Sequence, residues 1–170
     1  VSQWASAFAE AGLGVSKSLG DLAGPMLFAI LMGTARAIYG KFGHKIDLEK
    51  FMLFSSVLCI GSYLLTALSP NPVFSLIGCG ICGFSVGILW PGTFSLACAG
   101  IKGGGTLMFA LFALAGDIGC ATGPAVVGNA AELLGGSLDL GILCGIIFPV
   151  LMTGGLLLYR LSKKRAAEKP

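Results

Sequence analysis

The chain has 170 residues, of which 55% are hydrophobic and only 11% are charged. Soluble domains carry about 25% charged residues, so this composition excludes an ordinary soluble domain and predicts a membrane protein. The formal net charge of only +3 gives no reason to expect a nucleic-acid partner.

Long apolar stretches separated by short polar turns predict membrane-spanning helices, since a spanning helix needs about 20 apolar residues. We expect an all-α membrane protein with five complete spans, at residues 22–40, 51–69, 73–101, 105–131 and 140–159. Residues 1–15 are too short to cross a bilayer alone and are expected to be the outer part of a truncated first span. Because the chain opens at Val1 without an initiator Met, we expect it to be the later part of a longer protein.

The basic residues indicate how these spans are oriented. If the tail at residues 160–170 is cytoplasmic, alternating spans place every lysine and arginine except Lys17 at or near the inner side. Cytoplasmic loops of membrane proteins carry an excess of Lys and Arg. The pattern therefore predicts a multi-pass protein of the cell membrane whose C-terminus is cytoplasmic.

The truncated first span contains Gln3, Trp4 and Glu10, which are polar for a helix that faces lipid. These residues are candidates for the lining of a polar cavity. The alternative is an interfacial position, with Trp4 as a membrane anchor and Glu10 in contact with solvent.

The span at residues 73–101 is uncharged for 29 residues. As one helix it would be about 44 Å long, well over the hydrocarbon core of about 30 Å. It must tilt or bend, and Trp90-Pro91-Gly92 is the expected place. Three glycines at helical spacing predict a face for close helix packing: Gly80, Gly83 and Gly87.

The span at residues 105–131 contains one ionisable residue, Asp117, near its middle. A carboxylate at this depth costs about 3 kcal/mol on insertion scales, so it usually faces a cavity or a partner. The following Gly123-Pro124 is expected to loosen the backbone hydrogen bonding of the helix. Asp117 is therefore a candidate for a polar pathway, and the alternative is a structural acid with a backbone or side-chain partner.

Residues that enzymes use for catalysis are not arranged here as catalysis requires. His44 is the lone histidine and lies in a basic turn without metal-ligand spacing. The pair Cys79 and Cys82 has no second pair beside it, so core packing is the better interpretation. The glycines at 103–105 lack the lysine and serine of a phosphate-binding loop. We therefore expect no enzymatic activity, no cofactor and no metal site.

The turn at residues 40–45 (GKFGHK) has a basic-x-Gly-x-basic core, and Gly33 and Arg36 lie one turn upstream. This pattern, the span count and the basic tail together resemble the C-terminal six-helix half of a major facilitator superfamily transporter. The turn departs from the family motif at Gly40, where the motif has an aspartate. The stretches MGTARAIYGK, GILWPGTFSLA and ALAGDIGCATGP look like a bacterial branch of the family that is loosely similar to its sugar symporters.

The resemblance implies a substrate cavity between two six-helix bundles, of which the N-terminal one is missing here. In this family the first and fourth helices of each half line the cavity. Gln3, Trp4, Glu10 and Trp90 would then face a small organic solute, with Trp90 as a stacking platform. The alternative for Trp90 is packing or interfacial anchoring.

The resemblance also assigns roles to charged residues. Asp117 would bind a coupling H⁺ or Na⁺, or would bridge to the missing bundle. Arg36, Lys41 and Lys45 would belong to a gating turn on the inner side, and the alternative for Arg36 is a simple interfacial anchor. Two other functions stay open: a membrane assembly or binding subunit that transports nothing, and a non-functional transporter fragment.

Overall fold

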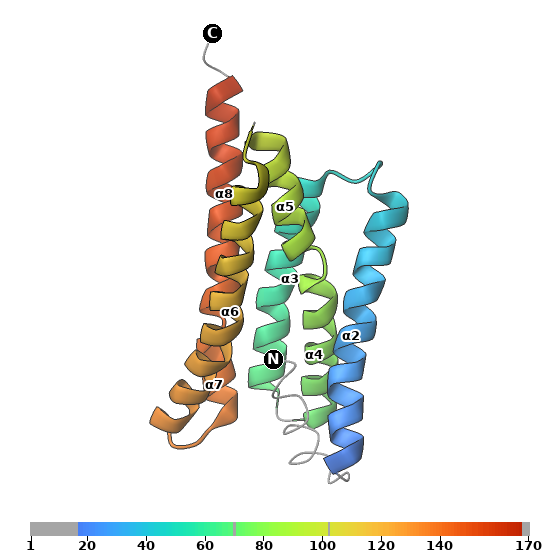
Figure 1. Ribbon diagram of the computed structural model, residues 1–170. Helices are drawn as coiled ribbons and strands as arrows, with labels where there is room; N and C mark the ends of the chain where they lie inside the picture. Colours follow the sequence, from blue (N-terminus) through green and yellow to red (C-terminus); the bar gives the residue numbers. More distant parts are fainter. Residues whose placement is uncertain (1–16, 70, 102, 168–170) are drawn as a thin grey trace.

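The structure is a computed structural model that describes residues 17–69, 71–101 and 103–167, and every regular element among them is an α-helix. The elements are α2 (Lys17–Phe42), α3 (Leu48–Leu68), α4 (Pro72–Val86), α5 (Leu89–Gly100), α6 (Gly105–Leu133), α7 (Leu138–Cys144) and α8 (Ile147–Ala167) (Figure 1). Four stretches are long and apolar enough to cross a membrane: Leu48–Leu68, Val73–Gly100, Gly105–Leu133 and Leu138–Arg165. The all-α prediction is thus confirmed for this part of the chain, while the partial span at residues 1–15 lies outside it.

The predicted span at residues 22–40 corresponds to α2, which is not among these four stretches. The helix begins earlier than predicted, at Lys17 rather than at residue 22. Gly20 costs a helix only about 1 kcal/mol relative to Ala, so the segment can join the helix that follows. Pro25 then lies inside α2 rather than at its first turn.

Two predicted spans are each divided into two helices, and both divisions fall at a glycine four positions before a proline. α4 and α5 are separated at Gly87, and Pro91 lies in the first turn of α5. α7 and α8 are separated at Gly145, and Pro149 lies in the first turn of α8. Proline has no N–H, and its ring clashes with the carbonyl of the residue four positions earlier. A bend was predicted at Trp90-Pro91-Gly92, about one helical turn after the break observed at Gly87. No break was predicted near Gly145.

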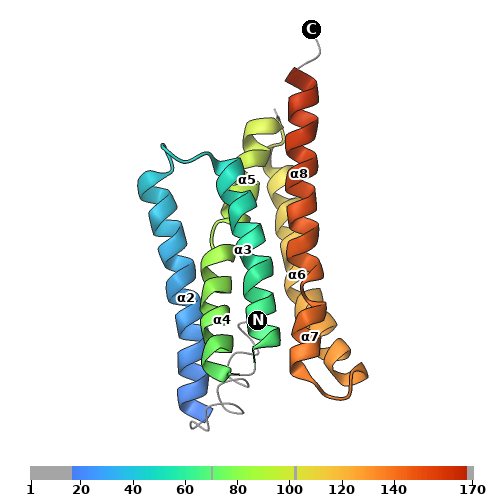
Figure 2. The same cartoon turned by 180° about the vertical axis from the view of Figure 1, so that it is seen from behind.

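α3 is the central helix of the described bundle. It packs against α4, α5, α7 and α8, while α2 packs on the outer side of α4 (Figures 1 and 2). Two small buried clusters hold these contacts together: Met52 with Ile88 and Leu156, and Ala67 with Val127 and Ile142. α6 differs from the other long helices, since its close backbone contacts are with α7 and only 6% of its apolar stretch is buried.

The glycine face predicted on the span at residues 73–101 is the surface on which α4 meets α2. A Cβ on Gly83 would lie 2.3 Å from the Phe28 carbonyl oxygen, and one on Gly87 would lie 2.8 Å from the Met32 carbonyl oxygen. A Cβ on Gly80 would meet leucine side chains of α2 at 2.9 Å. The two backbones therefore approach more closely than any larger residue would allow.

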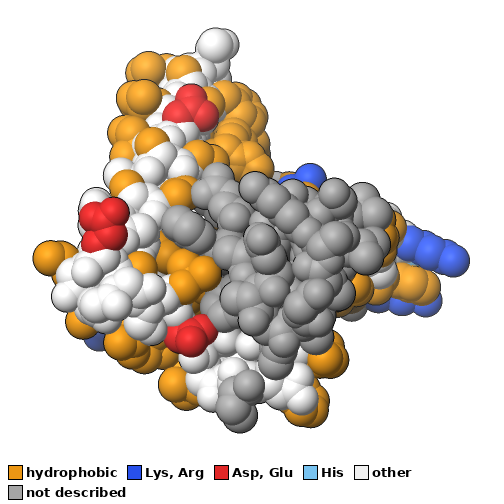
Figure 3. Space-filling model, turned by 90° about the horizontal axis from the view of Figure 1, so that it is seen from below, with side chains coloured by type: hydrophobic (Ala, Val, Ile, Leu, Met, Phe, Trp, Pro, Cys, Tyr) orange, Lys and Arg blue, Asp and Glu red, His pale blue; other side chains and the backbone are white. Residues whose placement is uncertain are grey.

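One end of the bundle is basic. The α2–α3 turn, the start of α6 and the C-terminal end of α8 all lie at that end (Figure 1). The basic residues of these segments are Lys41, Lys45, Lys50, Arg160, Lys163, Lys164 and Arg165. Figure 3 views the opposite end, where acidic side chains stand among apolar ones and basic side chains appear at the edges.

We predict that Gly83→Ala lowers the free energy of unfolding by about 1–3 kcal/mol, because its Cβ would collide with backbone rather than with a movable side chain. Denaturant titration in detergent micelles measures this. Gly61→Ala is the matched control, since a Cβ there meets nothing within 4 Å. The control should be neutral or stabilising, and equal losses in both variants would contradict the close-packing interpretation.

Candidate functional site

The break between α4 and α5 is held by a side chain from α2. Arg36 Nε donates a hydrogen bond of 3.0 Å to the carbonyl oxygen of Gly87. That carbonyl is the one that residue 91 would bond in an unbroken helix, and Pro91 has no N–H to offer. Arg36 therefore supplies a donor that the proline removes, a role that the sequence analysis did not assign to it.

The second break satisfies its backbone locally. Gly145 accepts a 3.2 Å bond from the amide of Phe148, within the same turn. The first break instead depends on a residue 51 positions away in the sequence. Because irregular backbone at membrane depth needs partners from the protein, the α4–α5 joint is coupled to the position of α2.

Trp90 lies at the start of α5 and links it to α6. Its ring would be 2.4 Å from a Cβ on Gly116, so the indole lies directly against the α6 backbone. Phe94 continues the contact, with an edge-on approach to Trp90 at 4.9 Å and a stacked approach to Phe109 at 5.6 Å. Phe112 joins the same cluster at 5.3 Å from Phe94. Trp90 remains 46% exposed, so part of its ring is free for another contact.

Asp117 follows Gly116 in α6, and its side chain is exposed. Phe109, Phe112 and Gly116 recur at helical spacing and form the face that meets α5. Asp117 lies one residue beyond that face, which corresponds to a rotation of about 100° around the helix axis. The carboxylate is thus beside the aromatic contact and directed away from α5.

The helix that holds Asp117 is continuous. α6 runs from Gly105 to Leu133 with Pro124 inside it, so the loosening expected beyond the acid does not produce a break. The Thr122 hydroxyl donates to the Ile118 carbonyl at 2.8 Å and keeps this turn of the helix tied together.

The predicted gating turn is short because α2 continues to Phe42. Lys41 lies over the Phe42 ring, 5.5 Å from its centroid, and Lys45 donates its amide to the Phe42 carbonyl at 2.8 Å. Gly43 is required here, since a Cβ would lie 2.5 Å from the Tyr39 carbonyl oxygen. The close approach of the Tyr39 carbonyl therefore explains why the basic-x-Gly-x-basic core has glycine at this position.

Asp47 closes this turn as the N-cap of α3. Its carboxylate accepts hydrogen bonds from the amides of Lys50, at 3.3 Å, and Glu49, at 3.0 Å. The amide of Lys50, together with the positive charge of the same residue, lowers the pKa of the Asp47 carboxyl below its usual 3.8. The cap is therefore charged, and fully present, at neutral pH.

An ion pair that the sequence did not indicate ties the start of α3 to the end of α8. Lys163 donates to the Glu49 carboxylate, whose side chain is only 16% exposed. The two residues are 114 positions apart, so no local pattern could have revealed the pair. Its effect is to fasten the last helix to the first turn of α3, next to the α2–α3 turn at the basic end.

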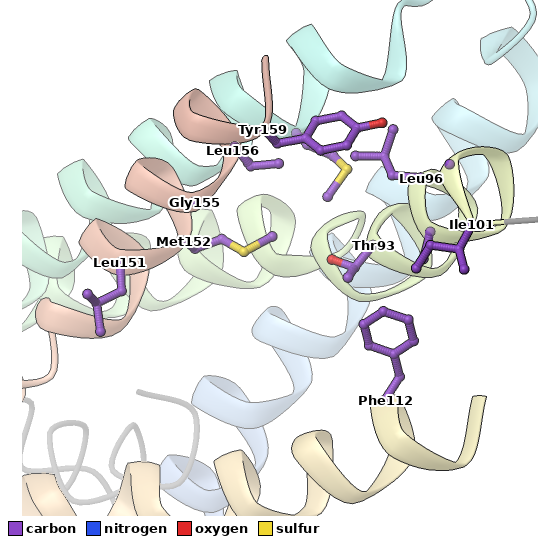
Figure 4. Close-up of a pocket in the computed structure, with 12 residues that line it drawn as sticks. Thr93, Leu96, Ile101, Phe112, Leu151, Met152, Gly155, Leu156 and Tyr159 are labelled. Carbon is purple, nitrogen blue, oxygen red and sulfur yellow. The ribbon is translucent and has the colours of Figure 1, made fainter. Parts of the chain in front are cut away.

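A cavity of about 440 Å³ lies between α5 and α8, with α6 on one side. In Figure 4, Phe112 points into it from α6, and Leu96 and Met152 approach it from α5 and α8. Its walls are almost entirely apolar. Neither Trp90 nor Asp117 lines this cavity.

The cysteines predicted to pack in the core and the glycines before α6 both have positions that the fold explains. Cys79 and Cys82 are buried as free cysteines in the α4 core. Among the described residues, no group of three His, Cys, Asp or Glu side chains could hold a metal ion. The φ angles of Gly103 and Gly105 are 82° and 49°, so these two glycines provide the left-handed backbone of the turn before α6.

The structure brings together some of the predicted site residues. Trp90 and Asp117 lie near each other across the α5–α6 contact. Lys41 lies in the last turn of α2, and Lys45 lies in the α2–α3 turn that follows. Gln3, Trp4 and Glu10 lie outside the described residues. The chain matches no family model, no curated protein and no solved structure.

We predict energetic coupling between Arg36 and Pro91. Arg36→Met should lower the free energy of unfolding by about 1.5–3 kcal/mol, because a carbonyl at membrane depth loses its charged donor. In a Pro91→Ala background the restored amide can bond Gly87, so the same substitution should cost at least about 0.5 kcal/mol less.

Denaturant titration of the four proteins of this double-mutant cycle measures the coupling. Pro149→Ala is the control background, because the Gly145 carbonyl already has a local partner. The cost of Arg36→Met should be unchanged there. An equal cost in the wild-type and Pro91→Ala backgrounds would refute the assignment.

Proposed function

We propose that this chain is the C-terminal membrane bundle of a major facilitator-type secondary transporter that moves a small organic solute by alternating access. The observation that supports this best is the exposed carboxylate of Asp117, on an apolar helix of spanning length of which only 6% is buried within the described chain. An ionisable residue in such a helix is by default a functional residue with a partner or a polar pathway.

Asp117 is the proposed coupling residue. An ionised carboxylate is costly in lipid, and binding of H⁺ or Na⁺ removes its net charge. The bundle can then change conformation with a neutral site, and it resists the change when the site is empty. A driving ion gradient is converted into solute transport in this way.

Trp90 is the proposed substrate platform. Its half-exposed ring lies against Gly116, next to the coupling residue in sequence. A solute ring stacked on the indole would therefore be held close to the carboxylate. Gln3, Trp4 and Glu10 would complete the polar part of this cavity, together with the N-terminal six-helix bundle.

The moving parts would be the α4–α5 joint and the basic end. The Arg36 contact makes the joint sensitive to a displacement of α2, and the Glu49–Lys163 pair fastens the gating turn to α8. Both are polar contacts that can break and re-form between two arrangements. The abundance of Lys and Arg at this end supports a cytoplasmic C-terminus in the cell membrane.

The exposure of α6 also supports a second candidate function, a membrane assembly subunit that transports nothing. A helix with one carboxylate and several small residues can dock onto a partner helix in lipid. In that case Asp117 would be an interface residue, and its neutralisation would change assembly rather than transport.

We predict that Asp117→Asn abolishes gradient-driven accumulation and spares exchange of solute down its own gradient. Asparagine keeps the size and polarity of the side chain but has no carboxylate that could bind or release the coupling ion. Uptake of a panel of radiolabelled sugars into vesicles, with and without an imposed H⁺ or Na⁺ gradient, measures both activities.

Asp139→Asn is the control, since Asp139 is an exposed acid in the first turn of α7. It should leave both activities intact. Normal accumulation by the Asp117 variant would refute the coupling role. Unchanged uptake after removal of the whole chain, with loss of a membrane complex, would favour the assembly subunit.

The proposed N-terminal bundle makes a further prediction about size. An antibody to the tail RLSKKRAAEKP should detect, in native membranes, a polypeptide of about twice the 17.3 kDa of this chain. A band near 17.3 kDa would mean that a second bundle must come from another chain.

A further inference from the structure

The apolar cavity between α5 and α8 does not fit the polar site proposed above. Its two polar side chains are Thr93 and Tyr159, and the Thr93 hydroxyl is already used, since it donates to the Leu89 carbonyl at 2.7 Å. The other walls are hydrocarbon, thioether or backbone glycine. A polar solute would leave its hydrogen bonds to water and find almost no replacements here, whereas a hydrocarbon chain has no such bonds to lose.

The cavity has one polar mouth. A second, adjoining hollow shares Gly100 and Tyr159 with it and continues to Ser162 and Lys163. Tyr159 and Lys163 are four residues apart on α8, so both lie on the same helix face. The apolar cavity therefore opens toward the basic end of the bundle, beside a tyrosine hydroxyl and an ammonium group.

The charge at this mouth is available to an anion. The Lys163 side chain is 62% exposed, and its ammonium has three donors, of which Glu49 needs one. Arg160 and Lys164 add positive charge on the same end of α8. Glu49 is the acidic side chain that bonds Lys163, and Asp47 adds a second negative charge near it.

We propose that the cavity and its mouth bind one acyl chain and the phosphate of an anionic phospholipid, from the leaflet at the basic end. The volume of about 440 Å³ lies in the range of about 300–1,000 Å³ that ligand cavities occupy. The acyl chain lies among Leu96, Phe112 and Met152, while Tyr159 and Lys163 contact the phosphate at the membrane surface. Lys163 then bridges the lipid and Glu49. This inference does not depend on transport.

Native mass spectrometry of the purified chain in detergent tests the proposal, with phosphatidylglycerol and phosphatidylcholine of identical acyl chains as probes. The wild-type chain should bind phosphatidylglycerol about fivefold more tightly, the ratio expected from one lysine near an anionic headgroup. Equal binding of the two lipids, or no retained lipid, would overturn the proposal. The second result would indicate that a protein segment covers the cavity.

Two adjacent glycines test the acyl site. A Cβ on Gly154 or on Gly155 meets nothing within 4 Å, and Gly155 alone of the two lines the cavity. Gly155→Leu should therefore abolish binding of both lipids, and Gly154→Leu should leave it unchanged. Retained lipid in the Gly155 variant would overturn the placement of the chain.

Two charge variants with opposite expected effects test the headgroup site. Lys163→Gln should bring the two lipids to equal affinity, whereas Glu49→Gln should raise the preference for phosphatidylglycerol, because Lys163 is released from its carboxylate. Both variants lose the same ion pair. If that pair were purely structural, both variants would change the preference for phosphatidylglycerol in the same direction. That result would overturn the assignment. Lys45→Gln, a basic residue at the same end but outside both hollows, should change nothing.

Discussion

The constraint on which this fold depends is that a helix at membrane depth must satisfy its backbone groups from within the protein. At the two helix breaks, a proline leaves a glycine carbonyl four positions earlier without its usual donor. Gly145 finds a local amide, but Gly87 takes Arg36 from another helix. The same close approach of α2 that delivers Arg36 requires glycine at 83 and 87. The proline and glycines of this stretch, the close packing of α2 and the position of Arg36 are therefore linked at the α4–α5 joint.

The consequence of this joint is a division of the bundle into two parts. α2, α3 and α4 share close glycine contacts and buried hydroxyls, such as Ser75, which donates to the Thr66 carbonyl at 3.1 Å. Beyond the joint, α5 meets α6 through aromatic rings rather than through close backbone packing. Phe112 of this aromatic cluster also lines the apolar cavity between α5 and α8.

Features that depend on local chemistry could be predicted from the sequence. The apolar lengths predict the long helices, the glycine spacing predicts a close-packing face on α4 without naming its partner, and Pro91 predicts the first break. Pro149 offered the same signal and was overlooked, because the stretch that contains it is of ordinary spanning length. The Glu49–Lys163 pair and the Arg36 contact join residues distant in the chain, and only the tertiary arrangement creates them.

The geometry of α6 separates two kinds of chemistry around one helix. Phe109, Phe112 and Gly116 lie toward α5, and Phe112 also closes one side of the apolar cavity. Asp117 lies about 100° away from that face, so its carboxylate does not enter the cavity. The proposed hydrocarbon ligand and the proposed coupling ion would then lie on different sides of α6 and could bind together. α6 has close backbone contacts with α7 but meets α5 through aromatic side chains, so the proposed lipid in the cavity would set the distance of this part of α6 from α8 and thereby the position of Asp117.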